Sequence, residues 1–307
     1  MSLPCYISYK YTNRRIRSPI KMKIFKSRNL EEYKMKHFLY LLKKQPLITG
    51  ILAIAVAIIS IHCIPTDGFL AGGLLRMLLS ATMAFFLYLI SGEKTLENCG
   101  HDVGYTIKVM MPYIVIAVIL GALSLLSAFA NNTLQADWYI RLPLLFFEML
   151  FVGIFEEVAF RAVINDAIVY QFRNFKYVFV LSAIAVTFLF GWGHIAFADV
   201  STPLLLSQAV AKILSSGLFG LALLFMYWKT RNIWACALVH AIYDFLLSLS
   251  MAFFQIEPVT SYVNTGDVGL AGLIAMSLQT IFAVIICIVV WKKVGRNMDF
   301  EEMRKNW

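Results

Sequence analysis

The sequence predicts an all-α fold, that of a polytopic helical membrane protein with about eight transmembrane helices. Of its 307 residues, 60% are hydrophobic and the mean hydropathy is +0.73, which is too apolar for a soluble globular domain. The hydrophobic residues gather in blocks of roughly 18–25 residues, the length that an α-helix needs to cross a bilayer. None of these blocks shows the period-two alternation of a membrane β-barrel.

Eight hydrophobic blocks follow one another along the chain, and each is expected to form one membrane-spanning helix. We expect residues 46–141 to hold three accessory spans, residues 142–254 to form a four-helix core, and residues 255–307 to hold the last span and a cytoplasmic tail. The approximate bounds of the blocks are residues 47–64, 70–90, 109–129, 142–165, 177–195, 204–228, 232–254 and 269–291.

The first 45 residues form a basic segment that is expected to stay in the cytoplasm. They contain no cleavable signal peptide, because the apolar segment follows too long a basic stretch and has no small-residue cleavage site. Residues 1–28 are expected to be disordered. Between Asn29 and Gln45, apolar residues recur at helical spacing beside lysines, which predicts an interfacial helix that leads into the first span.

Lysine and arginine alternate between the loops in a way that predicts the orientation of the protein. Every second loop is basic, and the loops between them contain almost no Lys or Arg. The basic loops are residues 91–108, 166–176 and 229–231; residues 65–69, 196–203 and 255–268 have neither residue, and 130–141 has Arg141 alone. The positive-inside rule is thus satisfied at every crossing, with both termini cytoplasmic. The compact loops favour a bacterial plasma membrane.

The net charge of +9 is explained by this topology and by contact with anionic membrane lipids, so we do not expect a nucleic-acid partner. The five cysteines are scattered, with no C-x-x-C pair, and indicate neither a disulfide framework nor a zinc knuckle. No cofactor is expected.

The most informative segment is residues 155–164, where two adjacent carboxylates and an arginine interrupt a hydrophobic block. A charge at this depth costs about 2.5–3.5 kcal/mol on insertion scales, so such groups are usually functional. Glu157 and Arg161 are four residues apart and share a helix face, which favours an ion pair. Glu156 points about 100° away, towards a different neighbour. A structural salt bridge explains one acid, and the surplus carboxylate favours chemistry.

Two further polar groups lie in the next spans. His194 ends the fifth block in the sequence Phe-Gly-Trp-Gly-His, and a single histidine there is more often a packing residue than a catalyst. His240 and Asp244 are four apart on the seventh block, where a carboxylate fixes the tautomer of an imidazole and raises its basicity. A structural His–Asp hydrogen bond has the same pattern. Three such groups in neighbouring spans predict one shared polar site.

The ordered trio E-E-x-x-x-R at 156–161, F-x-x-x-H at 190–194 and H-x-x-x-D at 240–244 resembles the CAAX protease and bacteriocin-processing (Abi) family, relatives of the Ras-converting CAAX endopeptidase. The resemblance covers about residues 142–250. It implies an intramembrane glutamate protease that needs no metal and cleaves membrane-associated or lipidated peptides or proteins. The implied biological role is CAAX-type processing or bacteriocin immunity.

The resemblance also implies roles for individual residues. Glu156 would act as general base and His194 would share the attacked water. His240, with Asp244, would steady the oxyanion, while Arg161 would hold Glu157. Phe190 is expected to pack beneath the site. The family's third motif usually ends in Asn, and an ionised Asp244 cannot donate to an oxyanion as an amide does.

Depth along the helices sets one constraint on this site. Counted from the cytoplasmic ends of their blocks, Glu156 and His240 lie eight or nine residues deep, whereas His194 lies about seventeen residues from Lys176. At a rise of 1.5 Å per residue, the expected mismatch is roughly 12 Å.

Three other functions fit parts of the pattern. A metalloprotease would use His194, His240 and a glutamate as zinc ligands, although no H-E-x-x-H is present. A thiol protease would pair Cys236 with His240. In a transporter, the charged residues of the membrane spans could line a translocation path. A scaffold or immunity protein would keep the fold without catalysis. The further charges lie towards the outer ends of spans two, four and six, where snorkelling or pairing is expected: Arg76, Glu148 and Lys212.

Overall fold

The computed structural model describes residues 34–64, 66–256 and 262–307, and these residues are almost entirely helical. Of the described residues, those from 42 onward form one compact unit and residues 34–41 lie outside it. The helix of residues 34–44 falls within the segment predicted to be an interfacial helix. The disorder predicted for residues 1–28 lies outside the described residues.

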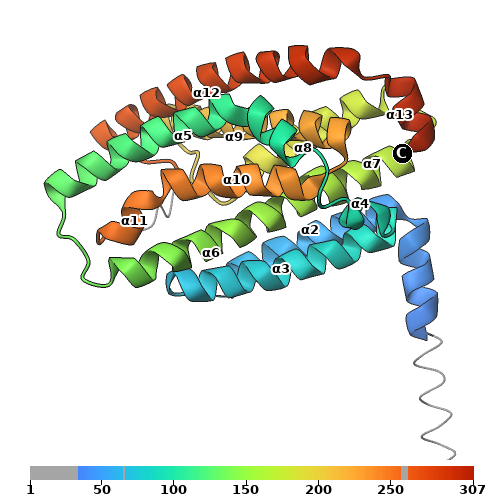
Figure 1. The fold of residues 1–307 in the computed structure, drawn as a ribbon, viewed down its shortest axis with the longest axis horizontal. Helices are drawn as coiled ribbons and strands as arrows, with labels where there is room; N and C mark the ends of the chain where they lie inside the picture. The colour runs from blue at the N-terminus through green and yellow to red at the C-terminus, as the bar shows by residue number, and fades with distance from the viewer. Residues whose placement is uncertain (1–33, 65, 257–261) are drawn as a thin grey trace, which may run out of the picture. The chain divides into compact units, whose positions relative to one another are not determined.

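Each of the eight hydrophobic blocks contains a helix, and shorter helices lie between them (Figure 1). The helices are α2 (Pro46–Cys63), α3 (Gly68–Ser91), α4 (Lys94–Glu97), α5 (Val103–Asn131), α6 (Trp138–Glu157), the π-helix η1 (Val158–Ile164), α7 (Asn165–Gln171), α8 (Val178–Gly193), α9 (Pro203–Thr230), α10 (Ile233–Leu247), α11 (Leu249–Phe253), α12 (Gly266–Val294), the 3₁₀ turn η2 (Gly295–Asn297) and α13 (Phe300–Asn306).

Several of these helices are long and apolar enough to cross a membrane, which indicates an integral membrane protein. Within the described residues four helices meet this description, α3, α5, α9 and α12, or five if residues 34–44 and the start of α2 count as one broken span. This number is below the eight expected. The difference arises because α8 and α10 have only 16 and 15 residues and α6 carries several charges.

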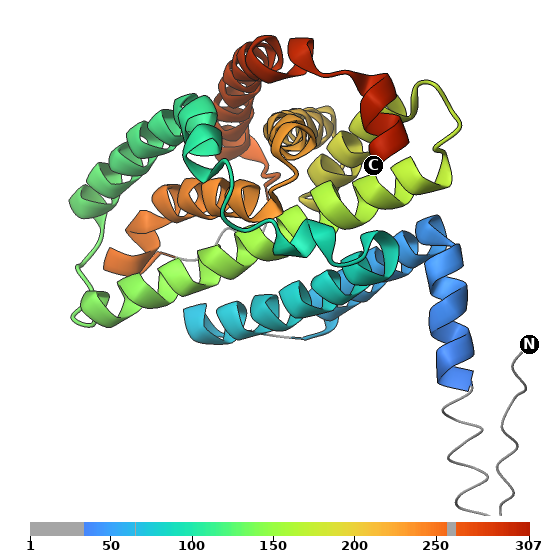
Figure 2. The same ribbon diagram turned by 45° about the vertical axis from the view of Figure 1, so that its right-hand side comes forward.

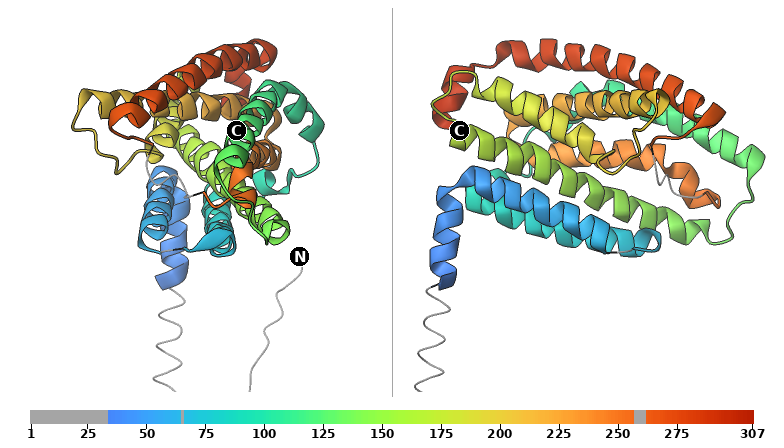
Figure 3. Two further views of the ribbon diagram at one scale, coloured as in Figure 1. Left: turned by 90° about the vertical axis from the view of Figure 1, so that its left-hand side faces the viewer. Right: turned by 180° about the vertical axis from the view of Figure 1, so that it is seen from behind.

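The helices pack around one continuous helical stretch, α6–η1–α7, which runs through the middle of the unit (Figures 1 and 2). The accessory helices α2 and α3 pack on one side of it and α10 packs on the other. Helix α9 pairs with α8 and α12, and α5 pairs with α10 (Figure 3). Of the 18-residue apolar stretch in α9, 61% is buried, whereas only 28% of the corresponding stretch is buried in α5 and in α12. Helix α9 therefore belongs to the core, and α5 and α12 expose more of their surface.

A π-helical segment begins directly after the two acids and continues without a break into α7. Its wider turns are uncommon, and short π segments inside α-helices are frequent at functional sites. The neighbouring helix α10 approaches α6 closely at Gly153, where an added Cβ would lie 2.6 Å from the carbonyl oxygen of Ala237. The absence of a side chain at Gly153 therefore allows α10 to lie directly against α6.

One end of the unit is joined by a network around Asp166, the second residue of α7, which is fully buried. Its carboxylate pairs with Arg231 at 3.3 Å, and burial, which alone would lower the pKa of Arg231, is outweighed by this contact so that the pKa is raised. The other donors to Asp166 are Ser91 at 2.5 Å, Asn165 at 2.9 Å, Tyr227 at 3.2 Å and Trp307 at 3.2 Å. The network thus gathers three of the loops predicted to be basic, together with the C-terminal residue.

Candidate active site

His240 lies between the two glutamates and divides the site into a sealed side and an open side. Its Nδ1 atom lies 2.7 Å from Oε1 of Glu157, and its Nε2 atom lies 3.3 Å from Oδ2 of Asp244 and 3.7 Å from Oε2 of Glu156. The ring is 3% exposed. Carboxylates only accept hydrogen bonds when ionised, so both ring nitrogens must donate to satisfy Glu157 and Asp244 together. This arrangement favours the cationic imidazolium.

The sealed side consists of Glu157 and Arg161, whose side chains are both completely buried. Nη1 of Arg161 lies 3.3 Å from Oε1 of Glu157, so the ion pair expected from the spacing is present. In the described part of the chain, Oε2 of Glu157 and both terminal guanidinium nitrogens lack a hydrogen-bond partner. A buried ion pair with unsatisfied atoms costs stability, which is a trait of functional rather than purely structural pairs.

Arg161 is enclosed by α8 and α9. Its Nε atom donates to the carbonyl oxygen of Gly220 at 3.4 Å, and its guanidinium carbon lies 3.8 Å from the centre of the Phe190 ring. A Cβ at Gly220 would overlap the guanidinium, so the absence of a side chain there leaves the space that Arg161 occupies. Phe190 is 2% exposed and packs against Arg161.

The open side carries the surplus acid. The side chain of Glu156 is 24% exposed and that of Asp244 is 28% exposed, in contrast to the sealed Glu157. We expected Glu156 to face a different neighbour from Glu157. That expectation is corrected, because the imidazole of His240 is inserted between the two acids and presents one nitrogen to each.

His194 caps the end of α8 and reaches the site through Phe190. Its Nδ1 atom lies 2.9 Å from the carbonyl oxygen of Phe190, and its ring centre lies 5.1 Å from that of Phe190. The same phenyl ring lies 5.9 Å from the ring of His240. A carbonyl accepts only, so Nδ1 carries the hydrogen and Nε2 of the neutral ring is an acceptor. Within the described residues, His194 makes no hydrogen bond with Glu156.

The depth mismatch of His194 is about half of what the sequence predicted. Ser182 of α8 donates to Asn165 at 2.7 Å and marks a common level on the two helices. From that level Glu157 lies eight residues away and His194 twelve, which amounts to about 6 Å. The correction arises because the helix that holds the acids continues to Gln171, so the acids lie deeper than the block ending at residue 165 implied.

Sequence reasoning missed the aromatic floor of the site. Phe219 of α9 lies 5.1 Å from the ring of His240 and stacks on Tyr243 at 4.6 Å. Tyr113 of α5 packs against both of these rings. In the sequence, Tyr113, Phe219 and Tyr243 look like the many other aromatic residues of the chain. They come together near His240 only through the packing of α5, α9 and α10.

The additional intramembrane charges separate into two kinds. Arg76 and Glu148 approach each other to 3.8 Å between α3 and α6, which confirms pairing for these two. Lys212 of α9 instead places its Nζ atom 3.8 Å from the centre of the Tyr262 ring. Tyr262 in turn lies 6.0 Å from the ring of His194, so Lys212 belongs to the neighbourhood of the site.

The contacts of Cys236 and His240 and the grouping of possible metal ligands can be compared with what a thiol protease and a zinc protease require. Sγ of Cys236 donates to the carbonyl oxygen of Leu223 at 3.6 Å, and both nitrogens of His240 face carboxylates, so the pairing that a thiol protease needs is not formed. Over the described residues, no group of three or more His, Cys, Asp or Glu side chains has the arrangement to hold a metal ion.

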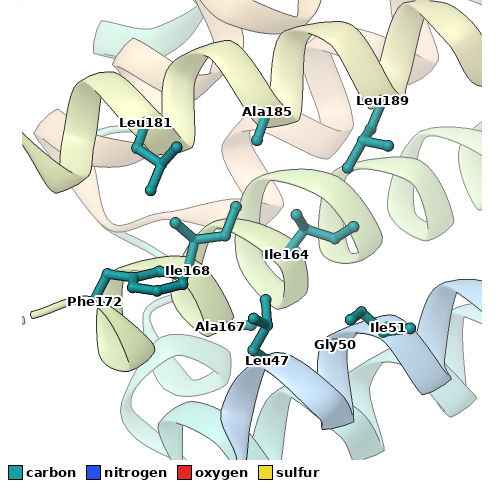
Figure 4. Close-up of a pocket in the computed structure, with 10 residues that line it drawn as sticks. All are labelled: Leu47, Gly50, Ile51, Ile164, Ala167, Ile168, Phe172, Leu181, Ala185 and Leu189. Carbon is teal, nitrogen blue, oxygen red and sulfur yellow. The ribbon is translucent and has the colours of Figure 1, made fainter.

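A separate hollow of about 280 Å³ lies between α2, η1, α7 and α8, and no charged residue lines it (Figure 4). Its lining is entirely apolar and includes Ile51, Ile164, Ile168, Leu181 and Leu189. Such a surface matches hydrocarbon and offers no group for chemistry, so the candidate active site remains the polar cluster around His240.

Comparison with known proteins supports the same region. Neither the curated proteins nor the solved structures that were compared gave a match. Among protein families, residues 138–246 match the Rce1-like type II CAAX prenyl endopeptidases. This segment begins with α6 and ends in α10, so it contains every residue of the three motifs. The chain therefore carries, over residues 138–246, a domain of the Rce1-like type II CAAX prenyl endopeptidase family.

Proposed function

We propose that this protein is an intramembrane endopeptidase of the glutamate type, with residues 142–254 as its four-helix catalytic core. The observation that carries the proposal is the unequal treatment of the two acids. Glu157 is neutralised by Arg161 on the sealed side, whereas Glu156 is partly exposed on the open side. A carboxylate kept at this depth without its own cation is costly, and its use as a general base accounts for that cost.

In the proposed reaction, Glu156 removes a proton from a water molecule while Nε2 of His194 accepts a hydrogen bond from the other hydrogen. The water oxygen attacks the carbonyl carbon of a peptide bond, and the carbonyl oxygen becomes a tetrahedral oxyanion. As the C–N bond breaks, the proton held by Glu156 moves to the leaving nitrogen. The carboxylate returns to its ionised form, so no net proton is gained or lost by the site.

His240 is proposed to organise the charges rather than to accept protons. As an imidazolium it holds Glu157 through Nδ1 and faces Asp244 and Glu156 through Nε2. Asp244 then serves as an acceptor that fixes the ring, a role that does not require the amide usual in the resembling family. Phe190 and Arg161 keep the ring of His240 at its level in the membrane.

The family supports a peptide as the substrate, and the proposed location of the site within the membrane supports a membrane-associated one. We propose that the substrates are membrane-associated or lipidated peptides or proteins, with prenylated C-terminal peptides as the first to be tested. The apolar hollow between α2 and α8 supports contact with membrane lipids, because its lining is entirely apolar (Figure 4).

We further propose that both termini are cytoplasmic and that α6–η1–α7, α8 and α10 lie within the bilayer beside the long apolar helices. Together with α2 and the four long helices α3, α5, α9 and α12, these three would complete the eight spans of the sequence prediction. The Asp166 network supports the orientation, since it joins residues of three basic loops, Ser91, Asp166 and Arg231, at one end. A bacterial plasma membrane is the proposed location.

The test compares Glu156→Gln with Glu148→Gln, a matched change on the same helix that lies outside the polar cluster. Both purified variants are assayed in detergent with internally quenched peptides, with and without a prenylated C-terminal cysteine motif. We expect Glu156→Gln to abolish cleavage while its thermal unfolding stays close to that of the wild type, and Glu148→Gln to retain activity. A folded Glu156→Gln protein with near-normal turnover would refute the mechanism.

The same assay separates the remaining alternatives. Cleavage by the glutamate mechanism should survive exhaustive chelation, whereas a zinc protease would lose activity together with its metal and regain both on addition of zinc. A scaffold or immunity protein would cleave none of the peptides and would keep its cellular function when Glu156 is replaced.

A further inference from the structure

The proposed reaction leaves one need that the motif residues do not meet. The tetrahedral oxyanion must be stabilised by a hydrogen-bond donor or a cation that faces the substrate, and such a group is usually a large contributor to catalysis. The need for this group rests on the proposed function.

The donors of the sealed side are either engaged by carboxylates or enclosed away from the substrate. Both nitrogens of His240 face carboxylates, Nδ1 towards Glu157 and Nε2 towards Asp244. Arg161 is completely buried and is held by Glu157, by the carbonyl of Gly220 and by the ring of Phe190. The terminal nitrogens of Arg161 have no hydrogen-bond partner among the described residues but are completely buried, and Nε2 of His240 is directed at Asp244. Neither side chain therefore offers an N–H that is both unengaged and exposed on the open side, where Glu156 lies.

The motif residues of the open side accept rather than donate. Glu156 and Asp244 are carboxylates. The Nδ1 atom of His194 is committed to the carbonyl oxygen of Phe190, which leaves Nε2 of the neutral ring as an acceptor suited to water. Acceptors can hold and deprotonate water, but they repel the oxyanion that forms when the water attacks.

Lys212 is a cation close to the open side. Its Nζ atom lies over the ring of Tyr262 at 3.8 Å, and Tyr262 lies 6.0 Å from the ring of His194. The backbone of the next residue, Ile213, lies against Gly191, which places this turn of α9 beside the end of α8. Asp244, Glu156 and His194 are all within electrostatic range of the ammonium group.

No acid neutralises Lys212 at contact distance in the described part of the chain, since its near partner is an aromatic face. A cation–π contact holds an ammonium group while leaving its N–H donors free for a ligand. We therefore propose that Lys212 is a further catalytic residue, whose ammonium group donates to the oxyanion of the tetrahedral intermediate.

Charge balance supports this assignment. The site holds three carboxylates, Glu156, Glu157 and Asp244, against the cations Arg161 and His240. Lys212 supplies the third positive charge, and without it the cluster would carry a net negative charge inside the membrane. Such a cluster would disfavour both its own burial and the formation of an oxyanion.

The experiment compares Lys212→Met, Lys212→Arg and Tyr262→Phe, with Lys229→Met as the matched control in the last turn of the same helix. Steady-state cleavage of the quenched peptide gives kcat and KM. Binding of a phosphinic peptide, whose anionic tetrahedral group mimics the oxyanion, is compared with binding of a neutral, uncleavable ketomethylene peptide.

We expect Lys212→Met to lower kcat by about 10²–10³-fold with little change in KM, as for the loss of one oxyanion donor. The same variant should lose affinity for the phosphinic peptide while it keeps its affinity for the neutral one. Lys212→Arg should recover part of kcat, and Tyr262→Phe should change little because the ring remains. Lys229→Met should behave as the wild type.

A Lys212→Met protein that keeps kcat and phosphinic affinity, in a preparation whose wild type cleaves peptide and depends on Glu156, would overturn this inference alone. Equal loss of affinity for both peptides would also overturn it, since it would assign Lys212 to substrate binding or to structure. A large loss in Tyr262→Phe but not in Lys212→Met would assign the donor to the tyrosine hydroxyl. A wild type that cleaves no peptide would refute the proposed function together with this inference.

Discussion

Gly153 offers the most direct test of whether the site depends on the spacing between α6 and α10. It lies four residues before Glu157 on α6, and α10 passes directly over it. A methyl group added in Gly153→Ala would meet the carbonyl oxygen of Ala237 at 2.6 Å and the amide nitrogen of Ala241 at 2.8 Å. Both atoms belong to the backbone of α10 on either side of His240, so a side-chain rotation cannot relieve the clash.

The expected displacement follows from these distances. Restoring ordinary van der Waals contact at 3.4 Å requires the helices to separate by about 0.8 Å at this point. The same shift would lengthen the contact of 2.7 Å between His240 and Glu157 to about 3.5 Å, beyond the useful range of a hydrogen bond. Overpacking costs about 1–3 kcal/mol, offset in part by about 1 kcal/mol from the better helix propensity of alanine. A misplacement of this order lowers catalysis by about 10²-fold.

The assay pairs Gly153→Ala with Gly104→Ala in α5, where an added Cβ would meet nothing within 4 Å. Thermal unfolding in detergent and peptide cleavage are measured on both. We expect a lower unfolding temperature and strongly reduced turnover in Gly153→Ala, and no loss of either in Gly104→Ala. If Gly153→Ala retained the turnover and the unfolding temperature of the wild type, the argument that the close approach of α10 builds the site would be wrong.

Two other changes test the halves of the site. Arg161→Met should lower stability by about 3 kcal/mol, because it removes one of the two cations that face the buried carboxylate of Glu157 and leaves only His240. Denaturation of Arg161→Met and of the double variant with Glu157→Gln checks this, and the double variant should recover much of the loss. Asp244→Asn should keep substantial activity, because an amide oxygen still accepts from Nε2 of His240. Cleavage rates compared with those of His240→Ala decide the point, and an equally large loss would show that the negative charge of Asp244 is required.

The helical segments could be read from the sequence, because hydrophobic blocks of membrane length are a strong and local signal. Their exact extents could not. The block predicted to end at residue 165 continues as a helix to Gln171. The polar residues there, Asn165 and Asp166, look like the start of a loop, but Ser182, Arg231 and Trp307 satisfy them from distant parts of the chain. Such contacts cannot be inferred from local composition.

The pairing within the site was predictable where it depended on one helix and was not where it depended on two. The spacing of Glu157 and Arg161 predicted their ion pair, and the contact of His240 with Asp244 follows from the same four-residue spacing. The insertion of His240 between Glu156 and Glu157 depends on how α10 packs on α6, for which the sequence holds no local signal. Lys212 carried a signal, a charge in an apolar block, but its contact with Tyr262 comes from a loop more than forty residues away.

In the proposed mechanism, the acidic motif combines two different tasks in adjacent residues. Glu157 is sealed, paired and essential to the packing of Arg161, so its replacement should be seen first in stability. Glu156 is partly exposed and has no cation of its own, so its replacement should be seen in rate. A helix that places consecutive residues about 100° apart can serve both tasks only if a third group separates them. The imidazole of His240 provides that separation, since each of its nitrogens faces a different carboxylate.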